Sequence, residues 1–314
     1  MALTTNTFPT YSAIGNREDL SNEIYMVAPF EAPILSNLQR SVATATLHEW
    51  QTQGISAAAA NAQLEGDQPS NTSLTASVRR SNRIQISRYV PSVTGTQQAV
   101  NKAGRENELS YQVYLMSLRL IRDMELDITS NTARVVGNST TAPVSAGLGA
   151  WIATNDVFGT SGVSPTGDGT DTRTDGTTRA FQESFLGTAL QNTFTSGGNP
   201  TFVSAGAFNK RQLSALLSGG ATRFKDSEDK SVIAAVDIFV SDFGRLEIWP
   251  NRFQRDRDLW CLDLDFAAIA YLKPFHSIPL AKDGDYEREM LQVYYCLEMR
   301  NEAAHTLVAD LTTS

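Results

Sequence analysis

Apolar residues recur every three or four positions across residues 106–131, and this spacing predicts a long amphipathic helix. Its apolar positions are Val113, Tyr114, Leu118, Ile121, Met124 and Ile128. We expect Glu106 and Glu108 in the first turn, where carboxylates favour the positive end of the helix dipole. Arg119 and Asp123 have the spacing of an ion pair along a helix. At about 1.5 Å per residue the helix would be on the order of 40 Å long, a spine for the subunit.

Strand-like patterns occupy residues 42–50 and 74–89, with a polar, alanine-rich stretch between them at 54–73. Two long strands joined by such a tip predict a hairpin arm with little core of its own, which needs a partner to lean on. The preceding residues, 1–45, predict an extended arm with one short helix that begins at Asn16.

The second half of the chain predicts two shorter helices, near 179–194 and 207–217, and mostly strands after them. The expected strands are 201–204, 232–240, 245–249, 259–263, 267–272, 289–299 and 304–309. One helical spine with many later strands predicts the α+β class. Residues 155–178 are rich in Gly, Thr, Ser and Asp, which indicates a loop or a locally mobile insertion.

Composition narrows the class of protein. The chain has 314 residues, 41% of them hydrophobic, enough for one large core or two smaller ones. Its net charge of −8 argues against a general nucleic-acid binder. No apolar run is long enough to span a membrane, and the first residues lack the features of a signal peptide. Cys261 and Cys296 are expected to be reduced thiols in strands.

A search for catalytic or metal-binding motifs finds almost nothing. The three histidines are scattered, and no nucleophile elbow, phosphate loop or dinucleotide motif is present. Residues 171–176 resemble the start of a calcium loop, but Arg173 occupies a ligand position and Gln182 replaces the bidentate glutamate, which favours a solvated loop. Asp263 and Asp265 are expected to line the polar face of a strand. The sequence therefore predicts no enzyme, no cofactor and no metal site.

Charge is distributed unevenly along the chain. Residues 74–105 contain six basic residues and no acidic one, whereas residues 256–314 contain eleven carboxylates and five Lys or Arg. A basic arm and an acidic body would attract each other across a subunit boundary. The candidate inter-subunit contacts are Arg79, Arg80, Arg83, Arg88 and Arg105. Two alternatives remain open: each region is a solvated face, or the arginines bind DNA phosphates.

Several phrases in the sequence resemble a branch of the tailed-phage major capsid proteins. They are GNREDL (15–20), IY (24–25), APFEAP (28–33), WIATN (151–155), GGNP (197–200), DFG (242–244), PNRF (250–253), LAK with GD (280–285) and EMRNEAAH (298–305). The phrases follow the family order and cover nearly the whole chain. The resemblance implies the Hong Kong 97 capsid fold. Ala32 and Asp283 depart from the pattern, since the family usually has Thr at both positions.

The resemblance also implies a division of the chain into five parts. They are an N-terminal arm (1–45), an extended loop (46–94), a peripheral domain with the spine helix (95–134), an axial domain (135–258) and the remaining strands of the peripheral domain (259–314). The implied function is self-assembly as hexamers and pentamers into an icosahedral shell of the virion. Such a shell is built in the host cytoplasm and encloses double-stranded DNA without sequence-specific binding.

Further expectations concern partners. The resemblance implies a portal protein at one vertex and decoration proteins, and the absence of a fused N-terminal scaffold suggests a separate scaffolding protein. The first lysine is Lys102, so lysine–asparagine cross-links from the extended loop are chemically unavailable. Two rival functions remain open. One is a cellular nanocompartment of the same fold that encloses enzymes, and the other is a phage maturation protease, for which no nucleophile–base spacing is evident.

Overall fold

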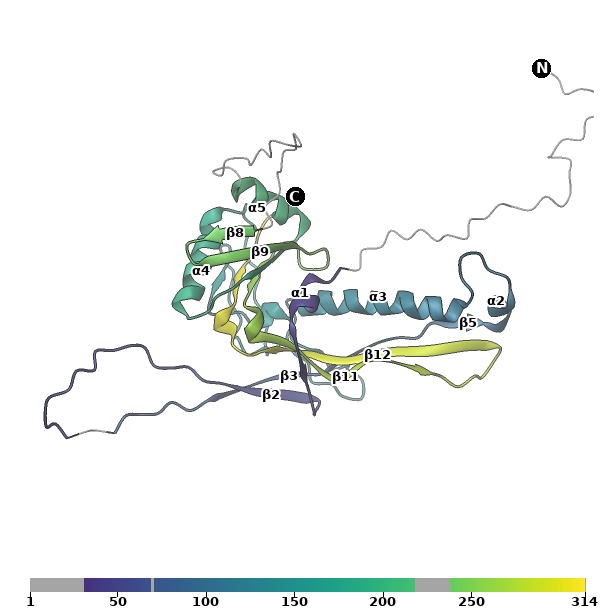
Figure 1. Cartoon of the computed structure of the whole chain (residues 1–314), viewed down its shortest axis with the longest axis horizontal. Coiled ribbons are helices and arrows are strands. Elements are labelled where there is room, and N and C mark those ends of the chain that lie inside the picture. Colours follow the sequence, from purple (N-terminus) through teal and green to yellow (C-terminus); the bar gives the residue numbers. More distant parts are fainter. Residues whose placement is uncertain (1–30, 69–70, 218–237, 314) are drawn as a thin grey trace, which may run out of the picture.

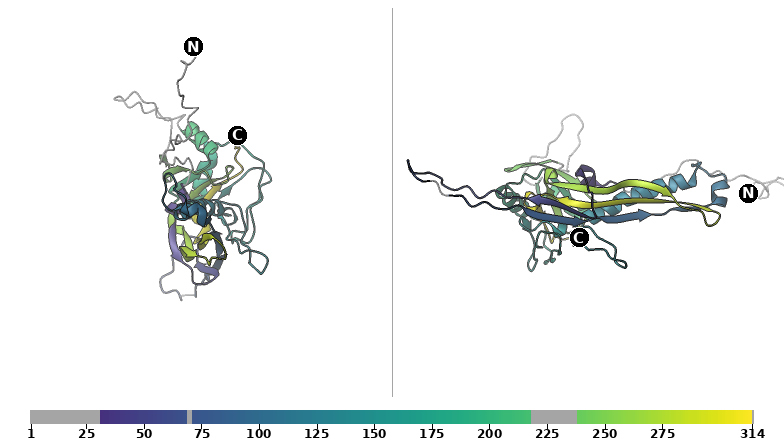
Figure 2. Two further views of the ribbon diagram at one scale, coloured as in Figure 1. Left: turned by 90° about the vertical axis from the view of Figure 1, so that its right-hand side faces the viewer. Right: turned by 90° about the horizontal axis from the view of Figure 1, so that it is seen from below.

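The computed structural model describes residues 31–68, 71–217 and 238–313. The short helix expected at Asn16 and most of the strand expected at 232–240 lie outside these residues. The described chain is elongated (Figure 1): a sheet-and-helix body carries α4 and α5, a long layer of helix on sheet extends from it, and a narrow hairpin projects in the opposite direction. The views in Figure 2 show that the long layer and the hairpin are both thin.

The long layer contains α3 (Glu108–Ile128), which is the expected spine helix and is confirmed with shorter ends. Asn107 caps the helix through its side chain, which accepts a hydrogen bond from the Ser110 amide. Glu106 therefore lies before the helix, and the 21 residues span about 32 Å rather than 40 Å. Tyr114, expected on the apolar face, is 54% exposed, and the buried positions of this face include Leu120.

The predicted ion pair between Arg119 and Asp123 is wrong, because both side chains turn to Tyr89 on the sheet beneath. The Tyr89 hydroxyl donates to the Asp123 carboxylate. The Arg119 guanidinium lies over the same ring, 4.5 Å from its centroid. A contact with a neighbouring element has replaced a contact along the helix, which spacing alone cannot reveal.

The sheet under α3 has the strand order β1-β11-β12-β4, and β5 pairs with the first residues of β12. Its strands are β1 (Gln39–Val42), β4 (Gln85–Tyr89), β5 (Ser92–Thr94), β11 (Ala267–Pro279) and β12 (Tyr286–Met299). Met124 and Ile128 of α3 belong to one buried cluster with Ile269, Tyr295 and Leu297 of this sheet. The short helices α1 (Pro33–Asn37) and α2 (Gly95–Ala99) flank the layer. The β11–β12 ladder is longer than the pattern predicts, because the outer half of β11 is mostly exposed and shows no regular apolar alternation.

The second body is a six-stranded sheet in the order β6-β13-β10-β7-β9-β8, covered by α4 and α5. Its elements are β6 (Asp156–Val157), α4 (Glu183–Thr195), β7 (Phe202–Ala205), α5 (Ala207–Leu217), β8 (Ile238–Ser241), β9 (Gly244–Pro250), β10 (Leu259–Leu262) and β13 (Thr306–Val308). The strands β10 and β13 come from residues assigned by sequence to the peripheral part, yet they pair here. Both cysteines are buried free thiols in strands, as predicted.

The projecting hairpin consists of β2 (Leu47–Thr52) and β3 (Val78–Arg83), paired antiparallel from Leu47↔Arg83 to Thr52↔Val78. The first predicted strand of the arm, 42–50, corresponds to β2 and shares only Val42 with β1. The second predicted strand is divided in the structure, since it supplies β3 and β4, with buried Ile84 between them. The arm therefore ends at Arg83, and the residues up to 94 belong to the long sheet.

Candidate inter-subunit contact surfaces

The arm is fixed to the body at its root by Glu298, near the end of β12. Its carboxylate accepts hydrogen bonds from the Ser41 hydroxyl of β1 and the Arg300 guanidinium, and it lies 3.0 Å from His48 Nε2 of β2. Burial acts to raise the pKa of Glu298, but the hydrogen bonds from His48, Ser41 and Arg300 outweigh it and lower the pKa to about 2. Glu298 is therefore an ionised anchor for the strand that leaves the body.

A second set of contacts fixes the other strand of the arm. The side chain of Asn82 is completely buried in β3, where it donates to the Leu297 carbonyl (2.7 Å) and accepts from the Ala146 amide (2.9 Å). The ring of Trp50 in β2 lies 5.4 Å from that of buried Trp151. These contacts pin the first residues of the hairpin, so its direction relative to the body is set at the root.

Beyond the root, the described residues of the arm are exposed to solvent. Every described residue from 53 to 79 is exposed, and hydrogen bonds there join the arm only to itself, for example Gln53 Nε2 to the Thr75 carbonyl at 3.1 Å. Ile55, Leu64 and Leu74 are 100%, 81% and 92% exposed. Large apolar side chains on a free arm indicate a surface that another chain covers.

The five candidate arginines do not form one patch. Arg79 lies 3.9 Å from Glu49 of the paired strand, with both side chains largely exposed, and Arg105 is paired with Glu108 at the start of α3. Within the described residues, Arg80, Arg83 and Arg88 have no carboxylate partner. Arg80 and Arg83 lie on β3 at the root of the arm, and Arg88 lies on β4. Together with Arg79, whose pair with Glu49 is long, these three remain candidates for an inter-subunit role.

The acidic C-terminal region is partly neutralised within the chain. Asp258 and Asp310 are completely buried and paired with arginines, and Asp263 caps a 3-10 turn by accepting from the Asp265 amide instead of lining a strand face. The exposed acidic positions include Asp283 and Asp285, in the turn between β11 and β12. At this turn Asp283 accepts from the Tyr286 hydroxyl and lies 3.4 Å from Arg288.

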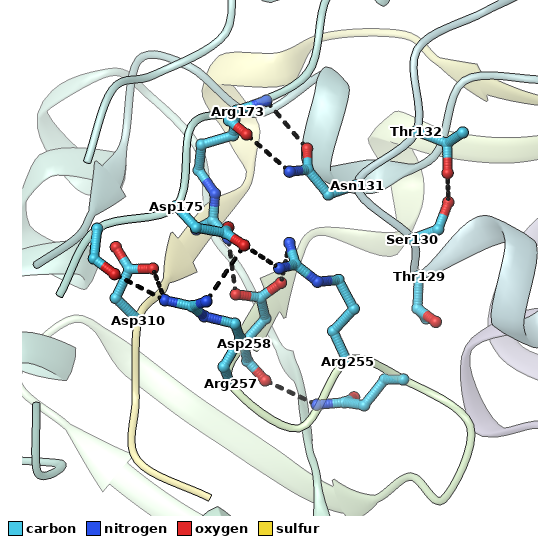
Figure 3. Close-up of polar contacts among 12 residues, drawn as sticks. Thr129, Ser130, Asn131, Thr132, Arg173, Asp175, Arg255, Arg257, Asp258 and Asp310 are labelled. Carbon is cyan, nitrogen blue, oxygen red and sulfur yellow. Dashed lines mark hydrogen bonds and ion pairs between the residues drawn. The ribbon is translucent and has the colours of Figure 1, made fainter. Parts of the chain in front are cut away.

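Figure 3 shows a cluster of arginines and aspartates that sequence reasoning missed. Arg173, with a side chain 0% exposed, donates to Asp258 at 2.8 Å and to Asp175 at 3.2 Å. Arg255 and Arg257 reach Asp175 from the other side, at 2.6 Å and 3.2 Å. The segment 171–176 is largely exposed, as expected from its composition, but the buried Arg173 side chain ties it to the body. Backbone bonds pin it further, since the amide and carbonyl of Arg173 bond the Asn131 side chain at 3.0 Å and 2.8 Å.

Another buried carboxylate, Glu125 of α3, joins three parts of the chain. It accepts from the Ile34 amide (3.0 Å), the Leu35 amide (2.8 Å) and Asn251 Nδ2 (2.5 Å). Burial raises the pKa of Glu125, although these hydrogen bonds act to lower it. Glu125 also explains the departure at Ala32: the N-cap of α1 has no side-chain acceptor, and Glu125 binds the free amides of its first turn instead.

Two further observations concern other site classes. In the ranges that the structure describes, no group of three or more His, Cys, Asp or Glu side chains can hold a metal ion. No helix among the same residues is long and apolar enough to cross a membrane.

A spine helix on a long sheet, a second sheet-and-helix body and a free hairpin arm together make up the Hong Kong 97 type of shell-forming fold. The family model of the SU10 major capsid protein matches residues 3–312. The chain therefore belongs to the SU10 major capsid protein family.

Relatives agree with this assignment. The major capsid protein of Escherichia phage Phieco32 is 29% identical over 149 residues, which cover 45% of this chain and 42% of that protein, so the match spans less than half of the relative. The capsid structure of cyanophage A-1(L) matches with a TM-score of 0.63 at 13% identity, over 98% of this chain and 99% of that one. The holo-SrpI encapsulin complex of Synechococcus elongatus PCC 7942 matches with a TM-score of 0.57 at 9% identity, over 96% of this chain and 94% of that one. Both structures show a shared fold.

Proposed function

We propose that the chain assembles with copies of itself, as hexamers and pentamers, into the closed icosahedral shell that encloses the double-stranded DNA of a tailed phage. The exposed arm carries this proposal. The described residues of this hairpin from 53 to 79 are all exposed and hydrogen-bond only within the arm, so the arm gains little folding free energy from its own subunit. Contacts with neighbouring copies supply that free energy, so folding of the arm and assembly are coupled.

Closed symmetry makes modest contacts sufficient, because each is repeated at every equivalent position in the shell. Interfaces of the permanent kind bury roughly 2,000 Å² or more, and a projecting arm adds such area without enlarging the body. Purified protein should therefore form closed shells visible by electron microscopy. A compact, permanently monomeric species in analytical ultracentrifugation, with an arm protected from proteolysis, would refute the proposal.

Arginines at the root of the arm are proposed to face carboxylates of an adjacent copy. Arg83 lacks a carboxylate partner in the described chain, and Arg79 has only a long, exposed pair with Glu49. Changing both, Arg79→Glu and Arg83→Glu, should abolish or strongly reduce shell formation while circular dichroism stays unchanged. The matched Arg79→Lys and Arg83→Lys variant keeps the charge and should still assemble. Normal particles from the charge-reversed variant would contradict this role.

The shell wall is proposed to contact DNA without sequence-specific binding. A net charge of −8 per chain repels phosphates on average, so packaged DNA can move along the wall. The partners proposed for the shell are a portal protein at one vertex, a separate scaffolding protein and decoration proteins, with assembly in the host cytoplasm. Co-purification of particles from infected cells, followed by mass spectrometry, tests each of these partners.

A cellular nanocompartment is the alternative that the fold itself allows, since an encapsulin shares it. Membership of a phage major capsid family favours the viral shell. The contents of the particle decide between them: a nucleic-acid genome supports the capsid, and a protein cargo supports the nanocompartment. We propose a structural role without catalysis. Both cysteines are buried with a raised thiol pKa, and burial lowers the pKa of His305 to about 4, so these groups are poorly suited to nucleophilic chemistry.

A further inference from the structure

The apex of the arm is a defined turn that presents one apolar side chain followed by two carboxylates. The Asp67 amide donates to the Leu64 carbonyl at 3.2 Å, and Gly66 adopts a φ of +79°, which allows the chain to reverse. Leu64 is 81% exposed and is followed by Glu65 and Asp67. No basic residue occurs between residues 54 and 78, so the apex is uniformly acidic.

A cavity of about 350 Å³ lies at the root of the arm, on the same subunit. Its apolar lining includes Ile84, Ile86, Val136 and Leu272, and Arg83 is also among the lining residues. Val136 and Ile86 are 61% and 46% exposed, so apolar surface is open to solvent here. None of the described residues that line this cavity is acidic.

We propose that the apex turn of one subunit docks into the root cavity of a second copy, with Leu64 in the apolar pocket and Glu65 or Asp67 paired with Arg83. This inference rests on the proposed shell function and identifies the contact made by the arm. Charge favours this cavity over the larger one of about 1020 Å³ beside β9, whose described lining includes Glu31 and Glu247 and no basic residue. An acidic apex would be repelled there.

The reach of the arm fits such a contact. Nineteen residues separate Thr46 at the root from Glu65 at the apex, which at about 3.3 Å per residue gives up to about 60 Å. A compact chain of this length has a radius of gyration of about 20 Å, so the apex extends well beyond its own body. Apex and cavity are different surfaces, and a head-to-tail contact between different surfaces forms a ring when the rotation between successive copies closes. Rings of this kind are the hexamers and pentamers of the proposed shell.

The test is a disulfide between the two surfaces in assembled particles. Leu64→Cys and Val136→Cys are introduced together, and the native thiols do not interfere because Cys261 and Cys296 are buried. Mild oxidation of assembled shells should give a ladder of linked subunits on non-reducing gels, which reducing agent abolishes. Single variants should stay monomeric on the gel, as should Leu64→Cys paired with Val240→Cys, since Val240 is 72% exposed on β8.

The outcomes distinguish the docking of the apex from the shell function. Shells that form but give no ladder, or a ladder only with Val240→Cys, overturn the docking of the apex while the shell function stands. Failure of the unmodified chain to form shells, with the other phage proteins co-expressed, overturns the shell function itself. A charge swap provides independent support: Glu65→Arg with Asp67→Arg, or Arg83→Glu alone, should lower the particle yield. Combining the three changes should restore it, and no restoration would argue against the pairing.

Discussion

Replacing Arg173 by methionine should release the loop that precedes α4 from the body. The substitution keeps much of the aliphatic side chain but leaves Asp258 buried without its closest cation, which lies 2.8 Å away. Removing one partner of a buried ion pair costs about 3–5 kcal/mol. Arg255 Nη1 remains 3.3 Å from Asp258, and two guanidinium nitrogens of Arg173 have no hydrogen-bond partner. The lower end, about 3 kcal/mol, is therefore expected.

Hydrogen–deuterium exchange measures this loss locally. The amides of Val163 and Thr174 bond each other's carbonyls at 3.1 Å and 2.9 Å, within the anchored segment. A loss of about 3 kcal/mol in local opening free energy corresponds to exchange that is faster on the order of 100-fold. Arg245→Met is the matched control, since its pair with Glu247 is 3.9 Å long and the two side chains are 61% and 53% exposed. We expect this control to change little.

The reasoning fails if Arg173→Met accelerates exchange in this segment no more than Arg245→Met does. A double variant then separates charge from packing. Arg173→Met with Asp258→Leu removes both buried charges, and it should recover much of the lost protection because no uncompensated carboxylate remains. If the double variant were as labile as the single one, the loop would depend on the shape of Arg173 rather than on its charge.

Two predictions follow from shifted pKa values. The pKa of Glu298 is about 2 in the folded chain, against about 4.3 in the unfolded chain. The ionised Glu298 therefore stabilises the fold fully above pH 4.3, and this contribution is lost as the pH falls towards 2. Glu298→Gln should therefore lower the free energy of unfolding at pH 7 by about 2 kcal/mol in urea titrations, with a smaller difference at pH 3; an equal loss at both would contradict this. For Asp156, burial raises the pKa to about 6, although the Ser164 hydroxyl donates to its carboxylate. The pKa in the unfolded chain is about 3.9, so the free energy of unfolding falls as the pH rises through 6. Asp156→Asn should stabilise the chain by about 2 kcal/mol at pH 8 and have no effect near pH 3.5 in the same titrations, and a gain that does not depend on pH would refute it.

Features that depend on local periodicity were predictable from the sequence. The spine helix follows from its apolar spacing, and the helix α5 has the predicted bounds. The ends of α3 required the cap at Asn107, whose role the pattern left unassigned. The arm was expected as a hairpin, but the division between β3 and β4 was not, because the alternation continues through Ile84, where the chain passes from one sheet to the other.

Features that depend on distant residues were not predictable. Arg173 and Asp258 are 85 positions apart, and Glu125 and Asn251 are 126 apart, so no spacing rule connects them. The sequence offered one signal at this site, the arginine Arg173 at a calcium-ligand position. It argues against a bound metal ion but does not identify Asp258 as the partner of Arg173. The exposed arm, in contrast, was predictable, because its lack of an apolar core is visible both in the sequence and in the structure.

The rigid root and the free arm have different sources of order, and this difference fits the proposal that one chain serves both hexamers and pentamers. Glu298 and Asn82 hold the root with buried hydrogen bonds, so each subunit presents its arm in a defined direction before it meets a neighbour. The described residues from 53 to 79 carry no such hydrogen bonds to the body, so in the proposed shell they can follow a neighbour whose angle differs between the two rings. Because the root fixes the direction of the arm, less conformational entropy is lost when the arm docks on a neighbour. The free segment of the arm adjusts to the different angle between subunits in the two rings. A capsid arm anchored along its whole length would lose this tolerance, and one with a loose root would lose the preorganisation.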